Sequence, residues 1–214
     1  MEKGESTVLI GLQYGDEGKA RVLDKIMKKV DIVARFNGGA NAGHTLEVGD
    51  KKIALHQIPS GIFHPDMLLY VGSGCVINPL KFNKEAGDIQ ALDISLKNRM
   101  FISAKITLVQ PHHVLLDGVF GGKIGTTGNG IGPAYSDQAI RAHGEKLRNL
   151  RLGDYTQNPE KSLEIVKENI LETVKAYDLK DVDVDALAEE FDMEMKKILE
   201  FCARDPLFLE KLVS

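Results

Sequence analysis

Residues 6–36 read STVLIGLQYGDEGKARVLDKIMKKVDIVARF, an apolar run, a polar loop that contains glycine, and then a helical pattern. Residues 6–12 are mainly apolar and predict a strand, and residues 19–30 repeat their apolar side chains at helical spacing. Residues 31–36 predict a second strand. Because a strand–helix–strand crossover is right-handed, the two strands would lie parallel in one sheet. This stretch predicts the opening of an α/β fold.

Further elements follow along the chain. Residues 44–48 and 51–58, joined by Gly49-Asp50, predict a β-hairpin, and residues 67–71 and 100–103 predict two more strands. A helix is expected after Pro79, between those two strands. Two amphipathic helices are expected at 159–177 and 185–202. We therefore expect an α/β fold with a mostly parallel or mixed central sheet, helices on both faces and a helical C-terminal extension.

Composition limits the class of protein. Hydrophobic residues make up 43% of the 214 residues and charged residues 27%, the balance of a soluble globular chain. The longest apolar runs are far shorter than the roughly 20 residues that span a bilayer, and the first residues lack the pattern of a secretory signal. A net charge of −4 argues against a nucleic-acid partner. We expect a cytoplasmic protein with no membrane partner, in which Cys75 and Cys202 are reduced structural thiols.

The chain changes character near Tyr155. Residues 155–214 carry 8 Lys and Arg against 15 Asp and Glu, a net charge of −7, and all 21 glycines and six histidines precede them. Glycine gives loops the backbone freedom to wrap a ligand. The sequence therefore predicts a nucleotide-binding and catalytic region at 1–154 and an acidic helical segment at 155–214.

The loop between the first expected strand and helix has the features of a phosphate-binding loop. Successive backbone N–H groups, a helix N-terminus and Lys19 would direct positive charge at one point. The loop is P-loop-like without being a Walker A motif, because Gln13 stands where the first glycine belongs and Ala20 replaces the metal-binding hydroxyl. Asp16 is then the candidate for binding Mg²⁺ or moving a proton. A solvated surface turn is the alternative.

A second glycine-rich stretch, residues 37–45 (NGGANAGHT), follows the strand expected at 31–36. In a parallel sheet it leaves the same edge as the first loop, so the two loops should face each other. His44 titrates near neutrality and is a candidate general acid or base. A purely structural histidine is the alternative.

A third stretch, residues 124–135 (IGTTGNGIGPAY), is followed by Arg141. Glycines, threonine hydroxyls and an arginine suit an anionic ligand, although a solvated glycine-rich loop fits the pattern equally well. His112 and His113 follow Pro111 in an expected helix. No metal-ligand spacing joins them to other His or Cys residues, so we expect them to be structural.

Five strings together resemble the adenylosuccinate synthetase family. They are QYGDEGK (13–19), ARFNGGANAGHT (34–45), LHQIPSG (55–61), IGTTGNGIGPAY (124–135) and LGDY (152–155). The resemblance implies a GTP-dependent ligase of purine nucleotide biosynthesis, which converts IMP, L-aspartate and GTP to adenylosuccinate, GDP and phosphate. It also implies Mg²⁺ as cofactor and a homodimer.

The resemblance assigns roles to single residues. Asp16 would be the base on N1 of IMP and would bind Mg²⁺ together with Gly43, His44 would be the acid, and Lys19 would complete the catalytic set. The implied GTP-binding residues are Gly15, Asp16, Glu17, Gly18, Lys19, Gly43, His44 and Thr45. The implied IMP-binding residues are Asp16, Lys19, Asn41, Ala42, Gly43, His44, Thr127 and Arg141, the last reaching the IMP of a neighbouring subunit.

The chain also departs from the family pattern. Tyr14 stands for Trp and Ala20 for Gly, and Asn129 and Ala142 stand where the family usually has basic residues, which removes positive charge from the IMP side. The family's later half, which binds aspartate and guanine, has no counterpart in these residues. Two hypotheses follow: the N-terminal half of a working ligase, or a truncated, non-catalytic nucleotide-binding or dimerisation module. An unrelated P-loop kinase is disfavoured by Ala20.

Overall fold

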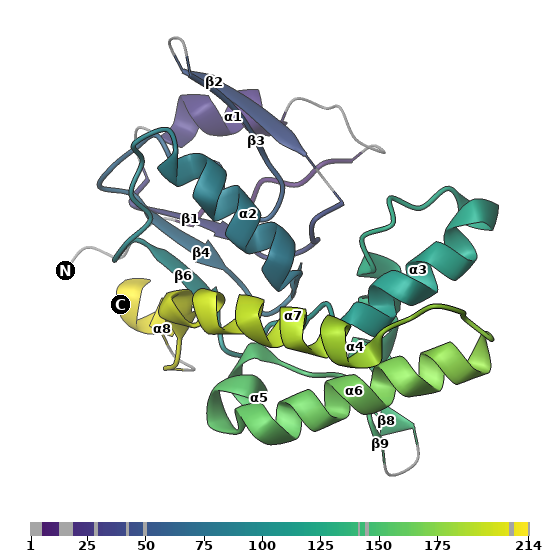
Figure 1. Ribbon diagram of the computed structural model, residues 1–214. Coiled ribbons are helices and arrows are strands. Elements are labelled where there is room, and N and C mark those ends of the chain that lie inside the picture. Colours follow the sequence, from purple (N-terminus) through teal and green to yellow (C-terminus); the bar gives the residue numbers. More distant parts are fainter. Residues whose placement is uncertain are drawn as a thin grey trace.

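A computed structural model of the chain contains a parallel β-sheet between helices (Figure 1). The central sheet has four strands in the order β1 (Ile32–Arg35), β4 (Leu68–Val71), β6 (Met100–Ser103) and β10 (Cys202–Ala203). All three of its strand pairings are parallel. The structure describes residues 6–12, 19–27, 30–41, 43–48, 51–140, 142–143, 146–205 and 208–213.

The smaller strands lie outside this sheet. The expected hairpin is confirmed as β2 (His44–Val48) and β3 (Lys51–Leu55), which pair antiparallel. A second antiparallel pair is formed by β8 (Ala142–His143) and β9 (Lys146–Leu147), and β5 (Val76–Ile77) pairs parallel with β7 (Thr107–Leu108). The sequence predicted a mostly parallel or mixed central sheet. In the described residues the central sheet is parallel, and the antiparallel pairs lie outside it.

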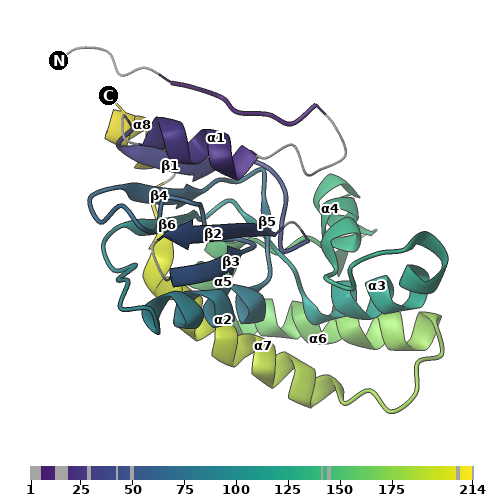
Figure 2. The same ribbon diagram turned by 90° about the horizontal axis from the view of Figure 1, so that it is seen from above.

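Helices cover both faces of the sheet, as expected. Figure 2 shows α1 (Lys19–Ile26) and α8 (Phe208–Val213) on one side, and α2 (Pro79–Gln90) and α7 (Val184–Ile198) on the other. Phe208 packs against the rings of Tyr70 and Phe101, with ring centroids 6.0 and 4.5 Å apart. Successive strand residues point to opposite faces, so Leu69 and Ile102 face away from Phe208. Both are completely buried.

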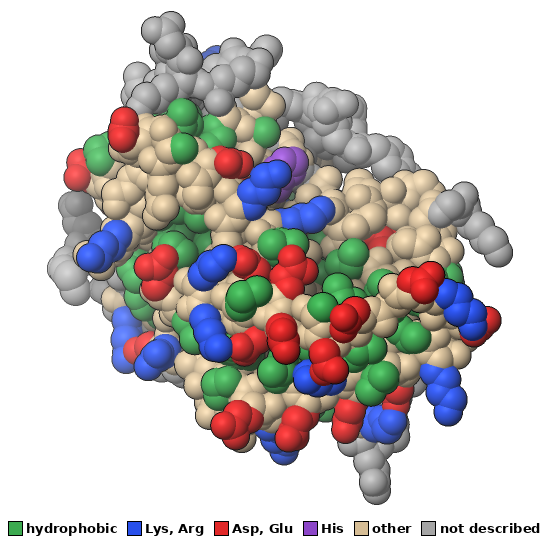
Figure 3. Space-filling model, viewed as in Figure 1, with side chains coloured by type: hydrophobic (Ala, Val, Ile, Leu, Met, Phe, Trp, Pro, Cys, Tyr) green, Lys and Arg blue, Asp and Glu red, His purple; other side chains and the backbone are tan. Residues whose placement is uncertain are grey.

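The remaining helices form a group beside the sheet. They are α3 (Pro111–Ile124), α4 (Ile131–Ile140), α5 (Leu152–Gln157) and α6 (Pro159–Ala176). The short 3₁₀ helix η2 (Leu199–Phe201) instead connects α7 to β10 and contacts β6. Buried residues of α6 and α7, such as Val166 and Met195, belong to the same core cluster as Leu69 of the sheet. The predicted boundary between residues 154 and 155 falls inside α5. Figure 3 shows acidic side chains gathered over α6 and α7.

Residues 6–12 form no strand, so that prediction was wrong. Val8, Ile10 and Leu12 are 72%, 58% and 87% exposed, and Figure 2 shows this segment running outside α1. An apolar run becomes a strand only where a neighbour supplies hydrogen bonds and a packed face supplies burial. β1 pairs with β4 alone among the described strands and stands at the edge of the sheet.

Other boundaries also differ from the prediction. The helix expected at 185–202 ends at Ile198, and Cys202 begins the strand β10. α1 is shorter than expected and ends at Ile26, and the next residue, Met27, is in a 3₁₀ conformation. β3 ends at Leu55 instead of residue 58, because the next backbone N–H groups bind the Glu85 carboxylate instead of a strand. None of the helices in the described part of the chain is both long and apolar enough to cross a membrane.

Candidate functional site

The second glycine-rich loop, residues 37–41, is held by two side chains from other elements. On α4, the Tyr135 hydroxyl accepts a hydrogen bond from the Gly38 N–H at 2.9 Å and donates to the Gly74 carbonyl oxygen at 2.9 Å. On β1, Arg35 donates to the carbonyl oxygens of His56 and, at 3.5 Å, Gly39. These contacts fix the path of the loop where it leaves the carboxyl end of β1. Ligands bind at this edge of parallel sheets.

Asn129 joins this loop to the third glycine-rich stretch. Its Nδ2 donates to the Ala40 carbonyl oxygen at 3.3 Å and to Thr127 Oγ1 at 3.0 Å, and its Oδ1 accepts a hydrogen bond from Lys81 Nζ on α2. Asn129 is buried, whereas Thr127 is exposed. Two of the stretches that carry the family resemblance therefore meet at one buried amide.

Gly130 makes this junction possible. Its φ is +70°, which L side chains rarely adopt, and a Cβ there would lie 2.9 Å from the His113 carbonyl carbon. The Gly130 N–H also donates to Asp117 Oδ2 at 2.8 Å. The backbone after Asn129 can therefore turn tightly against α3 only with glycine at this position.

A buried carboxylate organises the segment after β3. Glu85 on α2 is 5% exposed and accepts the backbone N–H groups of His56, Gln57 and Ile58 at 2.9, 2.9 and 3.0 Å. Burial raises the pKa of Glu85, and these hydrogen bonds oppose the rise. His56 is thereby held against the loop before β2, where a Cβ on Gly43 would lie 3.1 Å from the His56 ring.

The structure places only part of the predicted site. Gly43 directly precedes β2, His44 begins β2 opposite Leu55, and Thr45 pairs with Ala54. Asn41 is exposed in a turn. Lys19 is the first residue of α1, and only the backbones of Lys19 and His44 are described. The predictions for Gly15, Asp16, Glu17, Gly18, Ala42 and Arg141 fall outside the described residues.

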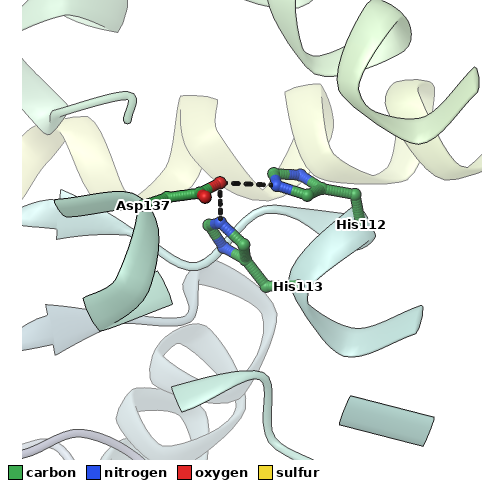
Figure 4. Close-up of side chains that lie close together, drawn as sticks. All are labelled: His112, His113 and Asp137. Carbon is green, nitrogen blue, oxygen red and sulfur yellow. Dashed lines mark hydrogen bonds and ion pairs between the residues drawn. The ribbon is translucent and has the colours of Figure 1, made fainter. Parts of the chain in front are cut away.

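A second cluster lies between α3 and α4, where Figure 4 shows His112, His113 and Asp137. Arg148 joins it through Asp137. His112 Nε2 and His113 Nε2 lie 3.0 and 3.1 Å from the same oxygen, Asp137 Oδ2, and Arg148 Nε lies 3.4 Å from it. The Gln110 N–H donates to His113 Nδ1 at 3.0 Å. His113 Nε2 therefore carries the ring proton and donates it to Asp137.

Charge favours a hydrogen-bond network over a metal site here. Burial lowers the pKa of His112 to about 3 and also lowers the pKa of His113, so both rings are neutral. Burial acts to raise the pKa of Asp137, but the hydrogen bonds from both histidines hold it below its usual range. Two nitrogens and one carboxylate oxygen could ligate a metal, but the Arg148 cation on that oxygen would repel one. We interpret the cluster as structural.

This network anchors the chain on both sides of residues 141–145. Asp137 lies one turn before the end of α4, and Arg148 directly follows β9. Arg148 Nη1 also lies 3.3 Å from both Asn169 Oδ1 and Glu172 Oε2 on α6. The backbone on either side of Arg141 is thereby tied to α3 and α6.

The free energy of unfolding is expected to fall as the pH is lowered from about 7 to about 5. An unfolded histidine titrates near about 6.5, whereas the pKa of His112 in the fold is about 3. In this window the unfolded chain binds more protons, so each buried histidine contributes a slope of up to roughly 1.4 kcal/mol per pH unit. Urea denaturation at several pH values measures the slope.

A variant isolates the histidine contribution. Glu85 acts with the opposite sign, because its raised pKa makes the folded chain bind that proton first. A His112→Gln chain should therefore show a shallower slope than the wild type between the same two pH values. Equal slopes in the two proteins would show that His112 is protonated in the fold.

Sequence reasoning missed several of these residues. Glu85, Lys81 and Asp137 carry no local motif, and Tyr135 lies in a quoted string but received no role. Each acts on a segment far away in the chain: 28 residues separate Glu85 from Gln57, and 97 separate Tyr135 from Gly38. For Glu85 the available signal was a charged residue on the helix face that buries Phe82 and Ile89.

Comparisons with known proteins identify the family of this chain. A family model described as adenylosuccinate synthetase matches residues 8–214. The chain belongs to the adenylosuccinate synthetase family. Adenylosuccinate synthetase 2 of Cupriavidus pinatubonensis is 41% identical over 211 residues, which cover 99% of this chain and 45% of that protein. Adenylosuccinate synthetase of Paraburkholderia phytofirmans is 44% identical over 174 residues, which cover 78% of this chain and 37% of that protein.

Solved structures give the same result. The structure of fully ligated adenylosuccinate synthetase from Plasmodium falciparum aligns with this chain with a TM-score of 0.78 and 31% identity. The alignment covers 93% of this chain and 46% of the Plasmodium chain. The succinoaminodeoxyadenylate synthetase of cyanophage S-2L shares the fold over 68% of this chain, with a TM-score of 0.55 and 24% identity. This chain spans about half the length of the adenylosuccinate synthetases it matches.

Proposed function

We propose that this chain carries the phosphate-binding and acid–base part of a GTP-dependent ligase that joins IMP to L-aspartate and gives adenylosuccinate, GDP and phosphate. The observation that supports this most directly is the Asn129 amide, which joins the loop before Asn41 to Thr127. Asn41 and Thr127 are both expected to contact IMP, and both are exposed near that amide. A solvated surface loop would not need such a buried connection.

In the proposed reaction Asp16 takes the proton from N1 of IMP, which makes O6 a nucleophile. The γ-phosphoryl group of GTP is transferred to O6, with His44 as the acid near that phosphoryl group and Lys19 beside the phosphates. The aspartate amine then displaces phosphate from C6. Binding of the phosphates by backbone N–H groups positions the reactants in line.

The expected ligands of Mg²⁺ are the Asp16 carboxylate and the Gly43 carbonyl oxygen, and such oxygen ligands suit this ion. Gly43 fits the assignment, because it is exposed and lies just before the hydrogen-bonded pairs of β2 and β3, which begin at His44. Bound there, Mg²⁺ would neutralise charge on the GTP phosphates. Arg141 is proposed to reach the IMP phosphate of a second subunit, which would make the working unit a homodimer.

A second candidate function is a nucleotide-binding or dimerisation module without ligase activity. The neutral Asn129 favours it, because the family resemblance implies a basic residue at this position, beside the loops assigned to IMP. The two candidates differ in one respect. A ligase half becomes active when the remaining part of the family fold is supplied, and a module that has lost catalysis does not.

A chimera separates the two candidates. The 214-residue chain would be joined to the part of the Cupriavidus relative that lies beyond the match, and adenylosuccinate formation followed by its ultraviolet absorbance. We expect product that requires GTP, IMP and aspartate together. The unfused chain should bind GTP weakly, with little preference over ATP, because phosphate contacts alone do not discriminate between bases, and it should form no product.

Two controls make the result decisive. The intact Cupriavidus relative is assayed in parallel, and circular dichroism and gel filtration confirm that the chimera is folded. A folded chimera that makes no product beside an active relative would contradict the ligase proposal and support the module. Product from the unfused chain would also require revision, because it would place aspartate and guanine contacts within these residues.

A further inference from the structure

Lys81 lies where the two glycine-rich stretches meet. It is the third residue of α2, and its backbone N–H donates to the Asn78 side chain that caps this helix, at 3.2 Å. Its side chain is exposed, and Nζ donates to Asn129 Oδ1. The ammonium group therefore stands beside the amide that binds Ala40 and Thr127.

The orientation of the Asn129 amide fixes this arrangement. Its NH₂ group faces two acceptors, the Ala40 carbonyl oxygen at 3.3 Å and Thr127 Oγ1 at 3.0 Å. Its oxygen is thus left to face Lys81. The reverse orientation would set the NH₂ group against the Lys81 ammonium and the amide oxygen against the Ala40 carbonyl oxygen. The amide is buried, so its contacts are not exchanged for water at low cost.

The charge of Lys81 is not balanced by an acid in the described part of the chain. Its Nζ donates to a neutral amide oxygen, whereas Lys196 and Lys197 on α7 each pair with a carboxylate. Arg35, on the other side of the loop 37–41, likewise donates to neutral carbonyl oxygens. An ammonium has three donors, and the Asn129 contact uses one of them. Two cations thus flank this loop with donors directed at neutral groups.

We propose that Lys81 is a further substrate-binding residue, whose ammonium binds the phosphate group of the nucleotide that also contacts Asn41 and Thr127. Asn129 acts as a positioning residue, because it holds Lys81 and both contact loops with one side chain. In this chain Lys81 supplies positive charge beside position 129, where the residue itself is neutral. The proposal rests on the proposed function, which assigns IMP to these loops.

Equilibrium binding tests the proposal without relying on turnover. The wild-type chain, Lys81→Gln and Lys81→Arg are compared for binding of IMP, inosine and GTP. Loss of a charge-assisted hydrogen bond should weaken IMP binding by about 10- to 100-fold in Lys81→Gln, and Lys81→Arg should retain most of it. Inosine lacks the phosphate and GTP is expected to bind at the other loop, so both should bind the three proteins alike.

Lys84→Gln is the matched control, because Lys84 is exposed on the same helix one turn later and its loss changes the net charge equally. It should bind IMP like the wild type. Urea denaturation should give nearly the same midpoint for Lys81→Gln and the wild type, because the Gln side chain can still donate a hydrogen bond to Asn129 Oδ1. Stronger salt dependence of IMP binding in the wild type than in Lys81→Gln is also expected.

The other outcomes overturn the proposal in distinguishable ways. Equal IMP affinity of the wild type and Lys81→Gln overturns the role of Lys81 and leaves the proposed function standing. Equal losses in Lys81→Gln and Lys84→Gln would reveal only a general effect of charge. Weaker GTP binding with unchanged IMP binding would assign the lysine to the other nucleotide. Failure of the wild-type chain to bind IMP overturns the proposed function and this proposal together.

Discussion

Asp137→Ala is expected to lower the free energy of unfolding by about 3–5 kcal/mol, the cost of removing one partner from a buried ion pair. Asp137 Oδ2 accepts hydrogen bonds from His112 and His113 and faces Arg148, and both histidines are completely buried. Alanine would leave two ring N–H groups without an acceptor in a site that excludes water. Urea denaturation near neutral pH measures the loss.

Two further variants locate the origin of that loss. Asp137→Asn keeps an oxygen acceptor but removes the charge, so it should lie between the wild type and Asp137→Ala. Asp185→Ala is the matched control, because Asp185 pairs with Lys167 while its side chain is 74% exposed, and exposed ion pairs contribute little. A loss in Asp137→Ala no larger than that in Asp185→Ala would show that the network does not anchor α4.

Asp16→Asn is expected to lower the rate of adenylosuccinate formation by at least about 1000-fold in the active chimera. Asparagine cannot accept the N1 proton, and it removes the charge from the expected Mg²⁺ ligand. General-base catalysis alone is worth roughly 100- to 10,000-fold. Steady-state turnover at saturating IMP, GTP and aspartate measures the effect, because the step lost is chemical rather than binding.

The matched control for this variant is Asp88→Asn, an exposed aspartate on α2 outside the proposed site. It should retain full turnover. Asp16→Asn should also keep the wild-type urea midpoint, so that loss of activity is separated from loss of fold. Turnover of Asp16→Asn within about tenfold of the wild type, a barrier change of only roughly 1.4 kcal/mol, would contradict the assignment of the base.

The elements with a strong local pattern were predictable. The hairpin at β2 and β3, the strands β4 and β6, and the helices α6 and α7 all occur at or near their predicted positions. The periodicity of apolar residues identifies such elements because each buries one face. Residues 6–12 show the limit of this reasoning, since their composition is equally apolar and yet they stand exposed.

The candidate site was predictable in its residue types and less so in its construction. The glycine-rich strings identified the loops and the family, because a tight backbone path around a ligand requires glycine at fixed spacing. They gave no indication that Glu85 would bind three consecutive N–H groups after β3, or that Tyr135 would hold Gly38. The roles of Asp16, His44 and Arg141 remain predictions from the sequence.

The sequence alone established the α/β class, the family resemblance and the separation of a glycine-rich part from an acidic helical part. Those features depend on residues that are close together in the sequence, because periodicity, turn chemistry and local charge are local properties. The tertiary structure decided the strand order, the sharing of Asp137 by two histidines, and the contact of Lys81 with Asn129 across 48 residues. Such contacts depend on which surfaces pack together when the chain collapses, and no short stretch of sequence encodes that choice.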